Sequence, residues 1–239
     1  FTRLVVQTPD SFGKEVDRIL AKCEEKSDNY KYVLWYTARQ AENSKVMGMD
    51  EAFLYLVEKY YLQGKAYWLQ DSDIKKYKEA AEKLSNNTIG KQAQEIAILD
   101  TKNMPISLRQ LASQKDYTVV AFYDPTCGHC QKEIPRVDSV LRIMYKKGKK
   151  IQVFAINNSN EDEKWRNFIV DKKLNDFWIH AWDPQHTSRY RKDYNVYSNP
   201  IFYLIDREGK IIGKRLDHSN LEDFIQFYEK KIAAEKKAG

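Results

Sequence analysis

Two cysteines separated by two residues are the reactive feature of this 239-residue chain. Cys127, Gly128, His129 and Cys130 follow the apolar run 119–123, which reads as a buried strand leading into a helix. This is the layout of a redox dithiol. The dipole and free N–H groups at the helix start lower the pKa of the first thiol, so Cys127 is predicted to attack disulfides. Cys130 lies one turn on and is predicted to close a disulfide with Cys127 and release the product.

The remaining cysteine and the histidines are expected to play no part in a metal site. Cys23 is left alone once Cys127 and Cys130 are paired, and an odd count excludes a dense disulfide framework. We expect Cys23 on the apolar stripe of a first helix as a buried, inert thiol, with a redox or intermolecular role as the alternative. The other histidines share no metal-ligand spacing with one another or with the dithiol: His180, His186 and His218. We therefore expect no metal, and no cofactor beyond the Cys127–Cys130 disulfide.

The composition is that of a globular protein. Hydrophobic residues make up 42% and charged residues 31% of the chain. The net charge is +6, with 40 basic and 34 acidic residues interleaved rather than clustered, so no nucleic-acid partner is expected. No apolar run is long enough to span a bilayer. The chain starts at Phe1 rather than Met, and we expect a segment to have been removed ahead of it.

The first third of the chain has helical periodicity and little strand signal. Four helices are expected, with the first starting at Asp10 or Ser11, the second covering 28–42 from an N-cap at Asp28, the third covering 50–64, and the fourth covering 71–84. Ten aromatic residues from Tyr30 to Trp68 are expected to pack as core rather than to line a ligand groove. The polar stretch 85–87 is the predicted boundary, which gives an all-α domain over residues 1–87.

Strand and helix patterns alternate in the second domain, residues 88–239. Strands are expected at 96–99, 119–123, 151–156, 179–182, 201–205 and 211–212. Helices are expected over 107–111, after the dithiol, over 161–173 and from 221 to about 232. This order predicts an α/β fold with a βαβ core, and the hairpin around 206–209 adds an antiparallel edge.

Residues 88–235 resemble the thioredoxin-like superfamily, and within it the TlpA/ResA-like envelope thiol-disulfide oxidoreductases, which are related to AhpC/TSA proteins. The resemblance rests on five elements in order: an opening stretch at 88–93, the dithiol run 119–135, the loop 198–202, the hairpin 202–211 and the terminal helix. It implies a thioredoxin-like fold, a central mixed sheet flanked by helices, which here follows the all-α helical domain.

The resemblance also implies roles for residues outside the dithiol. In this superfamily the proline matching Pro200 is cis and faces the dithiol, where a substrate chain can lie across the sulfurs. Asn199 precedes it where relatives often carry Thr. Glu133 matches an acidic residue of the TlpA/ResA-like enzymes and is the candidate proton carrier, with a solvated helix carboxylate as the alternative. Ala121 occupies the position at which many thioredoxins have a buried Asp.

The direction of electron flow stays open. His129 between the cysteines favours the reduced form and an oxidising potential, as in the CGHC motif of protein disulfide isomerases, whereas the TlpA/ResA-like scaffold is more often reductive. A carboxylate at Asp124 opposes the thiolate.

The function predicted from these residues is a thiol-disulfide oxidoreductase that reduces, oxidises or isomerises protein disulfides in the bacterial envelope. It would be periplasmic or lipid-anchored, with protein thiols or disulfides as substrates and an upstream redox partner. Two alternatives remain. A peroxiredoxin-like peroxidase would favour Thr or Ser at the position of Asp124. A partner-binding protein would use its helical half for recognition and keep a non-catalytic disulfide.

Overall fold

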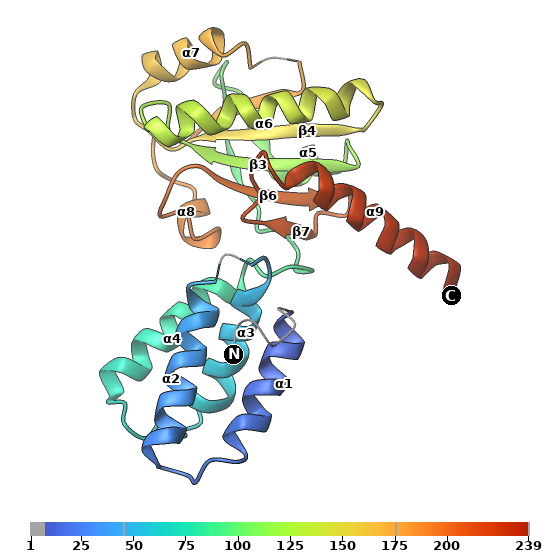
Figure 1. Cartoon of the computed structure of the whole chain (residues 1–239). Helices are drawn as coiled ribbons and strands as arrows, with labels where there is room; N and C mark the ends of the chain where they lie inside the picture. The colour runs from blue at the N-terminus through green and yellow to red at the C-terminus, as the bar shows by residue number, and fades with distance from the viewer. Residues whose placement is uncertain (1–7, 45, 175, 239) are drawn as a thin grey trace. The chain divides into compact units, whose positions relative to one another are not determined.

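The computed structural model describes residues 8–44, 46–174 and 176–238, so Phe1 lies outside it. The chain forms two compact units, Phe1–Thr88 and Ile89–Gly239. The first holds only helices among its described residues, and the second holds a seven-stranded sheet (Figure 1).

The described residues of the helical unit form four α-helices and one π-helical turn. They are α1 Pro9–Leu20, α2 Asp28–Glu42, α3 Met49–Leu56, the π-helical turn Val57–Tyr61 and α4 Asp71–Ser85. The first helix starts earlier than predicted, because the Thr8 side chain accepts a hydrogen bond from the Ser11 N–H and Pro9 supplies a preset first turn. The cap of α2 is Ser27 rather than Asp28, since its side chain accepts from the Tyr30 N–H.

Two expectations about this unit were wrong in detail. The third helix was predicted to stay regular up to Gly64, but the Leu62 N–H donates to the Val57 carbonyl five residues back, so its end widens into a π-helical turn. Cys23 does not lie on a helix, because α1 ends at Leu20. Its half-buried thiol donates to the Ile19 carbonyl and packs against the helical core.

The second unit is a mixed sheet flanked by helices, as expected for a thioredoxin-like fold. Its strands are β1 Ala97–Asp100, β2 Pro105–Ser107, β3 Tyr117–Tyr123, β4 Ile151–Asn157, β5 Trp178–Trp182, β6 Ile201–Asp206 and β7 Ile211–Lys214. Its helices are α5 Leu108–Ala112, α6 Gly128–Lys146, α7 Asp162–Asp171, α8 Tyr190–Asp193 and α9 Leu221–Ala238. The strand order is β2-β1-β5-β4-β3-β6-β7, and β3, β4 and β5 run parallel.

The two faces of β3 pack against different helices. Val120 and Phe122 point to the face covered by α5 and α8, where they join one buried cluster. Alternation turns Ala121 and Tyr123 to the opposite face, across which α6 runs beside α9 (Figure 1). Both residues are fully buried, so the end of the strand fixes where α6 can begin.

The segment 90–93 runs along the outer side of the β6–β7 hairpin. The Gly90 N–H donates to the Ile211 carbonyl at 2.7 Å, and the Ala93 N–H donates to the Gly209 carbonyl at 2.8 Å. Gly209 has a φ of +82°, in the left-handed region that favours glycine, and the Gln92 side chain packs closely against it. Within the described residues, no helix has the length and apolarity needed to cross a membrane.

Candidate active site

Cys127 occupies the N-cap position of α6, where β3 has ended and the chain turns into the helix. The backbone N–H of Cys130 lowers the pKa of the Cys127 thiol most strongly, and the His129 N–H adds to the effect against the opposing effects of burial and of the Asp124 charge. Gly128 and His129 form the exposed first turn. The local geometry thus favours a thiolate at Cys127.

Cys130 is the buried member of the pair. It is fully inaccessible, and burial raises the pKa of its thiol to about 12, with the Asp124 N–H acting in the opposite direction. Both cysteines have free thiols in this structure. The Cys127–Cys130 disulfide stays a prediction.

Asp124 affects the pKa of both thiols in the direction predicted from the sequence, against the thiolate. Its negative charge raises the pKa of Cys127 and of Cys130. One carboxylate oxygen accepts hydrogen bonds from the backbone and the hydroxyl of Thr126, both at 2.7 Å. Asp124 therefore also shapes the turn that precedes Cys127.

The loop before β6 faces the Cys127 thiol. The Asn199–Pro200 peptide bond is cis, and the Cys127 thiol points at the Asn199 carbonyl, 3.7 Å from its sulfur. The Asn158 amide donates to the Asn199 side-chain oxygen at 2.6 Å, and the Tyr190 hydroxyl donates to Asn158 at 2.9 Å. Sequence reasoning missed Asn158 and Tyr190. Asn158 follows β4, and the carboxyl ends of neighbouring parallel strands share one sheet edge, which was the available signal.

Glu133 is buried rather than solvated, with 5% of its surface exposed, so the alternative of a surface carboxylate is wrong. It lies one turn after Cys130 on α6, and both side chains belong to the buried face of the helix. Its carboxylate accepts from the backbone N–H of His218 at 2.9 Å and contacts the imidazole Nδ1 at 2.8 Å. His218 had been considered only as a metal ligand, and its contact with Glu133 was not foreseen.

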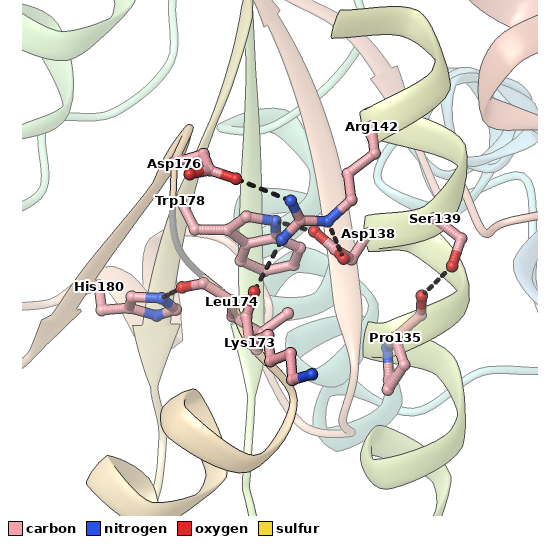
Figure 2. A network of polar contacts seen from close by, with 9 residues as sticks. All are labelled: Pro135, Asp138, Ser139, Arg142, Lys173, Leu174, Asp176, Trp178 and His180. Carbon is pink, nitrogen blue, oxygen red and sulfur yellow. Dashed lines mark hydrogen bonds and ion pairs between the residues drawn. The ribbon is translucent and has the colours of Figure 1, made fainter. Parts of the chain in front are cut away.

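The middle of α6 is braced by a second set of polar groups (Figure 2). Buried Asp138 accepts from the indole N–H of Trp178 and from Arg142, both at 2.7 Å. Arg142 also donates to Asp176 and to the Lys173 carbonyl (Figure 2). These contacts tie α6 to β5 and to the chain that precedes it, and they fix the helix that carries the dithiol.

The aromatic residues of the helical unit are only partly core. Phe53, Tyr60 and Tyr61 are buried as expected, but Tyr32 is 60% and Trp35 41% exposed. A groove of about 800 Å³ is lined by aromatic and charged side chains, among them Tyr32, Trp35, Trp68, Tyr77, Lys31 and Asp73. Some of the aromatic residues expected in the core therefore line a groove instead.

Comparison with known proteins points to redox chemistry in the second unit. The sequence model of the AhpC/TSA family matches residues 89–214. The thiol-disulfide oxidoreductase ResA of Bacillus thuringiensis subsp. konkukian is 26% identical over 144 residues, which are 60% of this chain and 78% of the relative.

Solved structures extend the comparison. A domain of a possible thiol-disulfide isomerase from Cytophaga hutchinsonii is 35% identical, with a TM-score of 0.54 over 61% of this chain and 96% of its own. A thioredoxin-like protein from Bacteroides caccae is 20% identical, with a TM-score of 0.71 over 92% of this chain and 76% of its own. This second likeness concerns the fold alone, and its coverage includes helical residues before the sheet.

Proposed function

The chain belongs to the AhpC/TSA family, and from that premise we propose that it is a thiol-disulfide oxidoreductase whose reactive group is the Cys127–Cys130 dithiol. One observation carries the proposal, namely the chemical asymmetry of the two thiols. The pKa of Cys127 is lowered at the start of α6, whereas that of buried Cys130 is raised to about 12. A reactive outer thiol and a protected inner thiol are what two-step disulfide exchange requires.

In the first step the Cys127 thiolate attacks one sulfur of a substrate disulfide. A bond forms between Cys127 and that sulfur, and the other substrate sulfur leaves as a thiolate. The substrate chain lies across the loop of Asn199 and Pro200, beside the attacking sulfur.

In the second step Cys130 loses its proton to Glu133 and attacks the Cys127 sulfur. The Cys127–Cys130 disulfide forms, and the substrate leaves as its second thiolate, so that the substrate is reduced by two electrons and the protein oxidised by two. The reverse sequence oxidises a substrate dithiol.

We further propose protein substrates, an upstream redox partner and a place in the bacterial envelope, either periplasmic or lipid-anchored. These extend the resemblance to the TlpA/ResA-like proteins. A peroxidase is less well supported, because the carboxylate of Asp124 is turned to Thr126 where a peroxide donor would be needed.

Trapping of the mixed disulfide tests the proposal. Cys130→Ser should accumulate mixed disulfides with protein substrates, and the wild type should reduce insulin disulfides. Cys127→Ser should do neither, while Cys23→Ser should behave as the wild type. A Cys127→Ser protein with full activity, or a wild type that consumes peroxide but leaves insulin intact, would overturn the assignment.

A further inference from the structure

Glu133 finds all of its described hydrogen-bond partners in one residue. Both of its oxygens lie within reach of the His218 Nδ1, at 2.8 and 3.0 Å, and one of them also accepts from the His218 backbone N–H. The contact joins α6 to the turn before α9, 85 residues further along the chain. A buried carboxylate held on both oxygens by one residue has a fixed orientation.

The side chains of Glu133 and His218 differ strongly in solvent exposure. The Glu133 side chain is 6% exposed, and that of His218 is 37% exposed. Glu133 is three residues from Cys130 on one helix, so their Cβ atoms are about 5–6 Å apart. These three groups therefore connect the protein interior with water: the buried Cys130 thiol, the buried Glu133 carboxylate and the half-exposed His218 imidazole.

We propose that His218 is the proton-exchange partner of Glu133, and that together they connect the Cys130 thiol with the solvent. The inference rests on the proposed function, since it concerns the step in which Cys130 closes the disulfide. His218 acts through Glu133 and is therefore a positioning residue, not a catalytic one.

The proton balance of the step is as follows. Cys130 transfers its proton to the Glu133 carboxylate and, as a thiolate, attacks the Cys127 sulfur. While Glu133 is a carboxylate, the Nδ1–H of His218 donates to it. Once Glu133 is protonated, the half-exposed imidazole exchanges with water so that its proton lies on Nε2, and the bare Nδ1 then accepts the Glu133 proton. The resulting imidazolium releases the Nε2 proton to water, so Glu133 ends as a carboxylate and His218 as a neutral imidazole, while one proton has left the protein.

Two acidic groups face the imidazole. Glu133 approaches from α6 and Asp217 from the same turn as His218, and a polar atom of each lies within 4.8 Å of the others. The Asp217 carboxylate accepts from the backbone and hydroxyl of Ser219, which fixes the turn. The imidazole through which the proton leaves is thus flanked by two carboxylates, one from α6 and one from its own turn.

A single-turnover measurement isolates the step. The reduced protein reacts with a coloured aromatic disulfide at Cys127, and the second release of coloured thiol reports closure by Cys130. His218→Asn retains a side-chain N–H for Glu133 but has no second nitrogen to titrate, and His218→Leu removes both. At neutral pH both variants should slow the second release by about tenfold or more, while the first release stays within about twofold of the wild type.

Added imidazole should restore much of the second release in His218→Asn, and the pH profile of that release should flatten in both variants. His186→Asn is the matched control, because His186 is exposed and its φ of +52° suits asparagine. A wild-type second release in His218→Asn, or a slow release that imidazole does not accelerate, overturns the inference and leaves the proposed function standing. A wild type that forms no mixed disulfide at Cys127 removes the proposed function itself.

Discussion

The two halves of helix α6 use polar groups in opposite ways. At its start, Cys127 and Cys130 are neighbours whose pKa values are moved in opposite directions. In its middle, buried Asp138 and partly exposed Arg142 form an ion pair whose hydrogen bonds continue to Trp178 and Asp176 (Figure 2). The start of α6 carries thiols that can exchange protons, whereas its middle holds charged side chains in fixed hydrogen bonds. The difference indicates that the fixed middle of the helix holds the reactive thiols in position.

The largest expected effect concerns the two thiols at the reactive end. Because the pKa of Cys127 is lowered at the helix start and that of buried Cys130 is raised to about 12, Cys127 carries by far the larger thiolate fraction at neutral pH. In a Cys23→Ser background, iodoacetamide should label Cys127 alone. Cys127→Ser should then react at least about a hundredfold more slowly, as followed by mass spectrometry. Equal labelling of Cys130 would contradict the asymmetry.

The braced half should respond to loss of Asp138 with a fall in stability. Asp138→Ala leaves the buried Trp178 N–H without its acceptor and removes one partner of Arg142, so the free energy of unfolding should fall by about 2–4 kcal/mol in urea denaturation. Asp138→Asn keeps the acceptor for Trp178 and should cost less.

The control for this prediction is a pair on the surface of the same unit. Lys164 lies 3.4 Å from Glu161, and both side chains are more than half exposed. Lys164→Met should change the free energy of unfolding by less than about 1 kcal/mol. An equal loss in Asp138→Ala and Lys164→Met would show that the pair of Asp138 and Arg142 does not brace the helix.

Acid should destabilise the sheet through His180. Its Nε2 contacts the Leu174 carbonyl at 2.6 Å, and burial lowers the pKa of its imidazole to about 4 (Figure 2). The unfolded chain, with a pKa of about 6.5, binds more protons between these values. The stabilisation is therefore complete above about pH 6.5 and is lost as the pH falls towards 4, by up to about 3 kcal/mol.

His180→Gln should remove this part of the acid destabilisation, because Gln retains an N–H for Leu174 but does not titrate. Urea denaturation at neutral pH and near pH 4.5 measures the difference for each protein, and His186→Gln serves as the exposed control. An acid dependence in His180→Gln as steep as in the wild type would exclude His180 as its source.

The smallest expected effect is electrostatic tuning by Asp124. Asp124→Asn removes the charge that raises the pKa of Cys127 but keeps an oxygen for Thr126. Alkylation of Cys127 should accelerate about two- to threefold in mildly acidic buffer and match the wild type at high pH, where the thiol is fully ionised. Thr126→Val retains the charge and should not accelerate alkylation in acid.

Much of the fold could be predicted because its central elements carry strong local signals. The apolar runs 119–123 and 151–156 lie within β3 and β4, and they are buried throughout as fully enclosed strands require. β2 and α8 have only three and four residues, too few to show a period, and neither was foreseen. The start of α1 was misplaced because Thr8, Asp10 and Ser11 are all acceptable caps, and only the folded chain selects one.

The candidate site likewise has features that sequence neighbours predict and contacts that only the folded chain creates. The helix start lowers the pKa of Cys127 and the charge of Asp124 raises it, and both effects come from sequence neighbours, so they could be worked out before folding. The contact between Glu133 and His218 spans 85 residues, and that between Asn158 and Asn199 spans 41. No local pattern encodes such pairs, because the packing of α6 against α9 and the parallel order of β3 and β4 create them.

The close fit of Gly209 against Gln92 has a consequence for self-association. Segment 90–93 occupies the hydrogen-bonding side of the β6–β7 hairpin that another chain would use, and the opposite border of the sheet is the three-residue strand β2, which contains Pro105. Neither border of the described sheet presents a long row of unpaired backbone groups. The backbone hydrogen bonds of segment 90–93, which runs past the turn at Gly209, therefore protect this side of the hairpin against edge-to-edge aggregation.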